Sequence, residues 1–171
     1  AELFMATLSG DKEEAKKLTG MENPKVIESG PEDTVFVYYM DHGAIGFCEV
    51  GKSELSDDVL INTINKMYEN KQYKQMVFYF EACHSGSMFG ALPKDMNIYV
   101  MTSADANHNA NMSNCPPDDE VGGEELDTCL AGLWDNFYLS YVEQHPDCTI
   151  GEIFDAVKAD VAKSSDQNVS E

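Results

Sequence analysis

Two short segments of this sequence carry residue types that nucleophilic catalysis requires. His42 and Gly43 lie in one segment, and Cys83 and His84 lie in the other. A cysteine thiolate is a strong nucleophile, and a nearby imidazole can deprotonate the thiol or stabilise the thiolate. The backbone N–H groups of Gly43 and Cys83 are suited to hold an oxyanion that develops on a substrate. The two segments therefore predict a Cys83–His42 dyad with an oxyanion hole beside it.

The strands and helices expected from the sequence bring these segments together. Runs of apolar, β-branched and aromatic residues predict strands at 34–40, 76–82 and 97–102. A helix from Asp57 to Glu69, capped by Ser56, separates the first two strands, which indicates a βαβ crossover in a parallel sheet. His42 follows the first strand and Cys83 follows the second, at the edge where the active sites of such sheets form.

Helices are also expected on both sides of this sheet. Helical spacing and capping residues predict them at 2–8, 11–18, about 130–145 and 149–162. The strand at 34–40 is apolar throughout, which predicts that both of its faces are buried. Together these elements predict a single α/β domain with a sheet between two layers of helices.

The residue types alone leave a purely structural interpretation open. A cysteine at a strand end is often a small buried hydrophobe, and a lone histidine is often a polar residue whose hydrogen bonds are satisfied. The placement of His42 and Cys83 after successive strands favours the dyad without deciding the question.

Composition and charge restrict the class of protein. The chain has 171 residues, of which 43% are hydrophobic, so one domain with a substantial core is expected. Eleven Lys and Arg residues oppose 31 Asp and Glu residues, and the formal net charge is −20, which disfavours nucleic acids and anionic membranes as partners. No apolar run is long enough to span a bilayer, and the first residues lack the basic region of a signal peptide. An acidic compartment fits this charge, because protonation relieves repulsion among carboxylates.

The two segments lie within the longer runs VFVYYMDHGAIGF and FYFEACHSGSMF, and other distinctive runs are AELFMATLSGDK, SGPEDTVFVYY, IYVMTSA and DNFYLSYVE. The first two runs resemble the patterns YYxDHGAPG and EACESGSMF of the legumain family of cysteine peptidases, the asparaginyl endopeptidases or vacuolar processing enzymes. The other runs have counterparts in that family in the same order. The resemblance covers the chain to about residue 145. It implies a caspase-like three-layer α/β sandwich, with a mostly parallel sheet covered by helices on both faces, at 1–163 and a flexible tail at 164–171.

The resemblance also implies an activity and roles for individual residues. It implies a cysteine endopeptidase that cuts peptides and proteins after Asn, and after Asp at lower pH, through an acyl-enzyme and without a cofactor or metal. His42 takes the position of the catalytic histidine, Cys83 that of the nucleophile and Gly43 that of the oxyanion glycine. Glu81 and Asp135 match acids of the pocket that accepts the Asn side chain. Two alternatives stay open: Asp135 as an exposed acid on a helix surface, and Glu81 as the structural partner of a cation.

The sequence departs from the family pattern beside the dyad and at its beginning. His84 replaces the acidic residue that usually follows the nucleophile, and Asp41 precedes His42, so both are expected to modulate the site. A first strand and helix, which in the family carry a catalytic Asn and a pocket Arg, have no counterpart here. The domain is therefore expected to be incomplete at its N-terminus, and an autoinhibitory C-terminal prodomain is expected as a partner.

Five cysteines leave at least one thiol unpaired within the chain. The resemblance implies a disulfide between Cys115 and Cys129 across a Pro-rich loop, with two free thiols as the alternative. Cys48 and Cys148 have no assigned partner. Because this loop borders the substrate site in plant relatives, a peptide-ligase side activity is a further expectation.

Asn111 and Asn168 begin N-glycosylation sequons, a weak signal. Asn168 is also a candidate autoprocessing site, with an ordinary tail as the alternative.

A lysosomal, vacuolar or secreted location is expected from the family. Two other functions remain alternatives, a catalytic subunit similar to that of GPI transamidase and an inactive homologue that acts as a binding protein.

Overall fold

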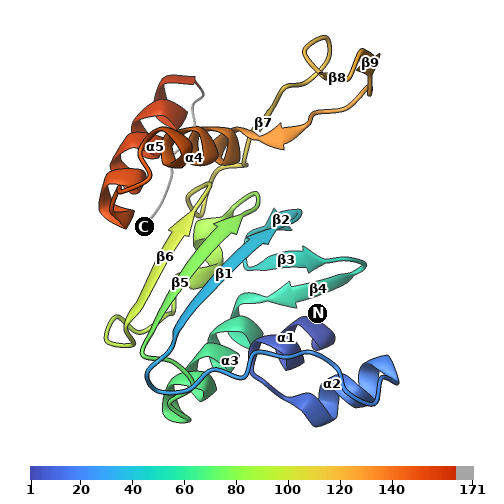
Figure 1. Ribbon diagram of the computed structural model, residues 1–171, viewed down its shortest axis with the longest axis vertical. Helices are drawn as coiled ribbons and strands as arrows, with labels where there is room; N and C mark the ends of the chain where they lie inside the picture. The colour runs from blue at the N-terminus through green and yellow to red at the C-terminus, as the bar shows by residue number, and fades with distance from the viewer. Residues whose placement is uncertain (165–171) are drawn as a thin grey trace.

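The computed structural model describes residues 1–164, and its centre is a parallel sheet of three strands in the order β1-β5-β6 (Figure 1). The strands are β1 (Thr34–Met40), β5 (Gln75–Glu81) and β6 (Ile98–Thr102). Tyr39 of β1 pairs with Phe80 of β5, which pairs in turn with Thr102 of β6. The three predicted strands and their parallel direction are therefore confirmed.

One face of the sheet packs against the N-terminal helices. These are α1 (Glu2–Leu8) and α3 (Asp57–Glu69), whereas α2 (Lys12–Thr19) packs against α1, and α3 has the predicted bounds. Side chains from α1, α3, β1 and β5 form one hydrophobic cluster, which includes Leu8, Leu60, Ile64, Val37 and Phe78. Ser56 precedes α3 as predicted, but its hydroxyl donates to the Asp58 carboxylate instead of capping a backbone N–H.

The opposite face packs against α4 (Leu133–Gln144) and α5 (Ile150–Ser164). Their side chains form a second cluster with β5 and β6, which includes Tyr79, Met101, Trp134, Phe154 and Val157. The predicted capping box of α5 is present, because the Thr149 N–H donates to Glu152 Oε2 (2.8 Å) and the Glu152 N–H donates to Thr149 Oγ1 (3.3 Å). Helices thus cover both faces of the sheet at β5 and β6.

The prediction that both faces of β1 are buried is wrong. Its burial alternates, and Phe36, Tyr38 and Met40 are 54%, 40% and 58% exposed. The reason is the position of β1 at one end of the described sheet, while α4 and α5 pack over β5 and β6. An unbroken apolar run is common to fully and half-buried strands, so it could not distinguish the two.

Short antiparallel strands complete the fold, and only the one at 47–50 was predicted. They are β2 (Gly43–Ala44), β3 (Phe47–Val50), β4 (Ser53–Ser56), β7 (Met112–Ser113), β8 (Glu120–Val121), β9 (Glu124–Glu125) and β10 (Ala131–Gly132). The strands β8 and β9 form a hairpin that projects from the body of the molecule (Figure 1). A disulfide between Cys115 and Cys129 closes the base of this arm, as the family resemblance implied.

No helix in residues 1–164 has the length and apolar character needed to cross a membrane. The predicted tail begins at Ser164, which is the last residue of α5. The remainder of that tail, with the sequon at Asn168, lies outside the described residues.

Candidate active site

The segments that carry His42 and Cys83 leave the sheet side by side. The Asp41 N–H donates to the carbonyl oxygen of Glu81 (3.2 Å), which extends the pairing of β1 and β5 by one residue. A Cβ atom on Gly43 would lie 2.6 Å from the carbonyl oxygen of Cys83, so only glycine fits between the segments. The two segments therefore lie next to each other, as the order of the strands predicted.

Backbone contacts hold the segment of His42. The side chain of Asp41 accepts hydrogen bonds from the His42 N–H (2.8 Å) and the Gly51 N–H (3.3 Å). The carbonyl oxygen of His42 accepts from the Glu49 N–H in β3 (2.9 Å). The Asp41 side chain therefore fixes the backbone on both sides of β3, and His42 itself is exposed.

Cys83 is partly exposed and has only a weak contact. Its Sγ lies 3.9 Å from the carbonyl oxygen of Ala110, in the loop that follows β6. A nucleophilic thiol needs access to the substrate, and the partial exposure of Cys83 provides that access. The loop after β6 thereby becomes a third wall of the candidate site.

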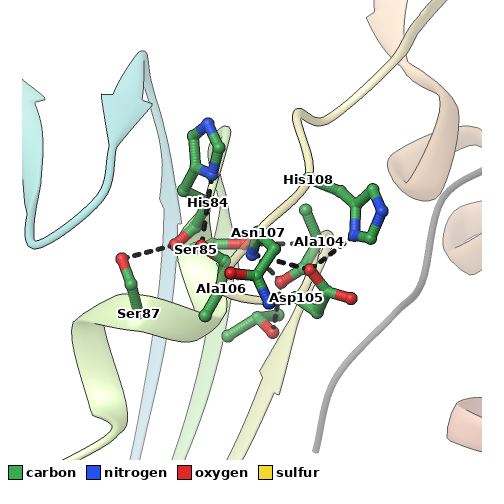
Figure 2. Close-up of polar contacts among 9 residues, drawn as sticks. His84, Ser85, Ser87, Ala104, Asp105, Ala106, Asn107 and His108 are labelled. Carbon is green, nitrogen blue, oxygen red and sulfur yellow. Dashed lines mark hydrogen bonds and ion pairs between the residues drawn. The ribbon is translucent and has the colours of Figure 1, made fainter.

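His84 joins the loop after β5 to the loop after β6 (Figure 2). Its backbone is left-handed (φ 56°), and its N–H donates to the carbonyl oxygen of His108 (2.8 Å). Its ring Nδ1 lies 3.2 Å from the carbonyl oxygen of Ala106. A Cβ on Gly86 would lie 2.9 Å from the Ala106 nitrogen, so the two loops are in close contact there as well.

A second histidine, His108, continues this network at the surface of the molecule. His108 Nδ1 lies 2.7 Å from Asp105 Oδ1 (Figure 2). Burial acts to raise the pKa of Asp105, but hydrogen bonds from the Asn107 backbone and from His108 outweigh it and lower that pKa. No simple sequence pattern links these residues to Cys83.

Glu81 and Asp135 form a buried pair of acids. They are only 5% and 4% exposed, and they come from the end of β5 and the first turn of α4. Burial and the charge of Asp135 raise the pKa of Glu81 to about 7. Burial also raises the pKa of Asp135, against an opposing hydrogen bond from Tyr38. Asp135 is therefore not the exposed acid of the alternative interpretation, and among residues 1–164 Glu81 forms no salt bridge with a cation.

Sequence reasoning missed Tyr38, whose hydroxyl donates to Asp135 Oδ1. The two residues are 97 positions apart, and no local motif connects them. Asn111, the residue that begins the other sequon, is exposed in the loop just before β7. Its glycosylation stays a prediction.

A sequence model of the peptidase C13 family matches residues 1–171. The chain belongs to the peptidase C13 family. It is 47% identical to the legumain of Rattus norvegicus over 109 residues, which are 64% of this chain and 24% of that protein. It is 38% identical to the legumain of Canavalia ensiformis over 146 residues, 84% of this chain and 30% of that protein. The vacuolar-processing enzyme of Glycine max is 39% identical over 146 residues, 84% of this chain and 29% of its own length.

This peptidase C13 chain therefore spans less than a third of the length of these relatives. Its fold is similar to the crystal structure of caspase-1 from Spodoptera frugiperda, with a TM-score of 0.56 and 12% sequence identity. That likeness covers 96% of this chain and 67% of the caspase chain. The α/β fold is caspase-like, as predicted.

Proposed function

We propose that this chain carries the nucleophile, the general base and two pocket acids of a cysteine endopeptidase that cuts after Asn. The observation that supports this most strongly is the contact between the Gly43 and Cys83 segments at the carboxyl ends of β1 and β5. The backbones of the two segments that carry His42 and Cys83 thus approach each other at the sheet edge where active sites form, which supports an imidazole, a thiol and two backbone N–H groups acting on one substrate. Membership in the peptidase C13 family supports the same chemistry.

The proposed reaction has two steps. Cys83 gives its thiol proton to His42 and its Sγ attacks the carbonyl carbon of the scissile peptide, and the oxyanion is held by the N–H groups of Gly43 and Cys83. The C–N bond then breaks, His42 gives a proton to the leaving amine, and a thioester remains. Water attacks the thioester, gives a proton to His42, and releases the acid product and the thiol. If a peptide amine attacks in place of water, the product is a ligated peptide, which is the proposed side activity.

The pair Glu81 and Asp135 supports the preference for Asn. The carboxamide NH₂ of Asn offers two N–H donors, and two buried carboxyl groups offer acceptors that a side chain without donors would leave unpaired. An aspartic acid side chain becomes a donor only when it is protonated, which accounts for the proposed cleavage after Asp at lower pH.

An acidic lysosomal or vacuolar compartment and an autoinhibitory C-terminal prodomain belong to the same proposal. The net charge of −20 and the names of the plant relatives support the compartment. Assays of the full-length protein before and after acid incubation test the prodomain, because acid incubation is expected to release activity.

The decisive experiment measures cleavage and covalent labelling by the full-length protein between pH 4 and 7. We expect cleavage of an Asn-containing peptide and not of the matched Gln peptide, with an Asn-directed covalent inhibitor bound to Cys83. Cys83→Ala is expected to abolish both, whereas Cys148→Ala, which removes another partly exposed thiol, is the matched control. Failure of Cys83 to react at every pH in this range would contradict the proposal and favour a binding protein.

A further inference from the structure

Among residues 1–164, one oxygen of the buried Asp135 carboxylate lacks a hydrogen bond of normal geometry. Oδ1 accepts a hydrogen bond from the Tyr38 hydroxyl, but Oδ2 has no hydrogen bond within residues 1–164, although Asp135 is 4% exposed. A buried acceptor without a partner destabilises a fold, because the hydrogen bonds that it lost with water are not replaced. Such an oxygen in a native structure calls for an explanation, and a donor brought by a ligand is the simplest one.

Gly132 shows where this oxygen points. A Cβ atom on Gly132 would collide with Asp135 Oδ2 and would lie 3.1 Å from Glu81 Oε1. The backbone of Gly132 has φ −69° and ψ 146°, which any residue adopts, so glycine is needed there for space and not for conformation. The two carboxyl groups therefore flank the same small volume at the start of α4.

The ring of Tyr38 is held in one orientation. It stacks on Trp134 (6.3 Å between ring centroids, 27°) and on Tyr138 (6.4 Å, 25°). Trp134 and Tyr138 stack on each other at 5.4 Å, so the three rings form one cluster. The hydroxyl of Tyr38 consequently has a fixed direction toward Oδ1 of Asp135.

We propose that Tyr38 is a positioning residue of the substrate pocket, which holds Asp135 by Oδ1 so that Oδ2 faces the carboxamide donor of the substrate. The identity of that donor rests on the proposed function. The Tyr38 side chain itself touches Asp135 and not the reacting atoms, so it acts through Asp135. This role also explains why a tyrosine occupies position 38, on the half-exposed face of β1.

The charges around Asp135 follow from this arrangement. The titratable groups that face the Tyr38–Asp135 contact are Glu81 from β5, Tyr38 from β1 and Tyr138 from α4. Burial raises the pKa of Asp135, and the Tyr38 hydroxyl, followed by the nearby backbone N–H groups of Gly132 and Asp135, opposes this rise. Removal of the hydroxyl therefore raises the pKa of Asp135 further, and the pocket loses its negative charge at a higher pH.

The first test compares Tyr38→Phe with Tyr138→Phe in the full-length protein. Both variants keep the aromatic cluster and remove one hydroxyl, but only Tyr38 bonds to Asp135. For Tyr38→Phe we expect KM for an Asn-containing peptide to rise about tenfold, as for one hydrogen bond to a charged group, and kcat to change less than about twofold. Tyr138→Phe is expected to leave both constants unchanged. An unchanged KM in Tyr38→Phe would overturn the proposal.

The second test needs no catalytic activity. Carbon-13 NMR of protein labelled in its Asp carboxyl groups follows the titration of Asp135 directly. We expect its midpoint to move to higher pH in Tyr38→Phe and to stay in place in Tyr138→Phe, and equal midpoints in all three proteins would overturn the proposal. If the wild-type protein cuts no peptide, the proposed function fails, while this titration still decides the role of Tyr38.

A third variant guards against misfolding of Tyr38→Phe. Gly132→Ala keeps the Tyr38 hydroxyl but displaces Asp135 Oδ2 from its position. We expect it to raise KM for the Asn peptide without changing the rate at which iodoacetamide alkylates Cys83. A normal KM in a folded Gly132→Ala protein would contradict the proposed orientation of Oδ2.

Discussion

The two halves of the candidate site are held in place by different means. Backbone contacts position His42 and Cys83, and their own side chains are exposed or only weakly bound. Buried side chains position Glu81 and Asp135, which depend on each other and on the Tyr38 hydroxyl. We therefore expect that His42 and Cys83, the proposed reacting groups, can be changed with little effect on folding, whereas a change in Glu81 or Asp135, the proposed pocket acids, alters stability and its dependence on pH.

The largest expected effect comes from Cys83→Ala. Removal of the nucleophile is expected to lower kcat/KM by at least about 10³-fold. Because Sγ has only a 3.9 Å contact with the Ala110 carbonyl oxygen, the melting temperature is expected to change by less than about 3 °C. Peptide hydrolysis and a thermal melt measure the two quantities. A large loss of thermal stability in Cys83→Ala would contradict the view that the Cys83 side chain, unlike Glu81 and Asp135, contributes little to folding.

Gly43→Ala tests the backbone contact that joins the two segments. The added Cβ would lie 2.6 Å from the Cys83 carbonyl oxygen and 3.0 Å from the Ala82 Cβ, so the segments must separate. We expect a loss of about 1–3 kcal/mol in the free energy of unfolding and of about 10²-fold in kcat/KM.

Gly151→Ala is the matched control, because a Cβ at that position in α5 meets no atom within 4 Å. It is expected to leave activity unchanged and to stabilise the helix by up to about 1 kcal/mol. Equal kinetics in Gly43→Ala and the wild type would show that the close contact does not position the dyad.

Glu81→Gln tests the pocket half through stability. Burial and Asp135 raise the pKa of Glu81 from 4.5 to about 7 in the folded state, so between these values the folded protein binds more protons than the unfolded chain. The free energy of unfolding therefore falls as pH rises through this window, by on the order of 2–3 kcal/mol for this one group. Glutamine does not ionise, so the variant is expected to lose this fall.

Thermal melts at pH 5 and pH 7.5 check this expectation. The wild-type protein is expected to be more stable at pH 5, and Glu81→Gln to be more stable than the wild type at pH 7.5. Glu125→Gln, which changes an exposed acid in β9, is the control and is expected to follow the wild type. A wild-type protein that is more stable at pH 7.5 would contradict the buried acid pair.

These two halves also differ in how far the sequence predicts them. The neighbourhood of His42 and Cys83 follows from two local signals, an apolar run that forms a strand and the residues directly after it. The order of the parallel strands then brings the two ends together without any knowledge of side-chain packing. The sheet and the helices at its two faces were predictable for the same reason.

The pocket half depends on contacts between distant parts of the chain. Tyr38 and Asp135 are 97 residues apart, and the residue types alone do not show that they meet. The exposure of one face of β1 depends on where α4 and α5 pack, and the two-residue strands β7 to β10 are too short to give a periodic pattern. Asp119 shows the same limit, because nothing in its acidic loop sequence distinguishes it from its acidic neighbours, yet it is buried and accepts the Thr128 N–H.

His84→Glu is expected to have the smallest effect, and it tests whether the loop network modulates the nucleophile. A cation beside Cys83 favours the thiolate, so an acid at this position makes the thiolate harder to form. The acidic limb of the kcat/KM profile is expected to shift to higher pH by about one unit, since each unit corresponds to about 1.4 kcal/mol. The contact between the ring Nδ1 and the Ala106 carbonyl oxygen is lost as well, so a modest loss of stability accompanies the shift.

Two controls separate charge from structure in this experiment. His84→Gln removes the charge without adding an acid, so its shift is expected to be about half as large. His145→Glu, which changes an exposed histidine at the end of α4, is expected to leave the profile unchanged. If His84→Glu and His145→Glu give the same profile, the histidine beside Cys83 serves only to join the loops after β5 and β6, and the dyad half of the site is set by backbone geometry alone.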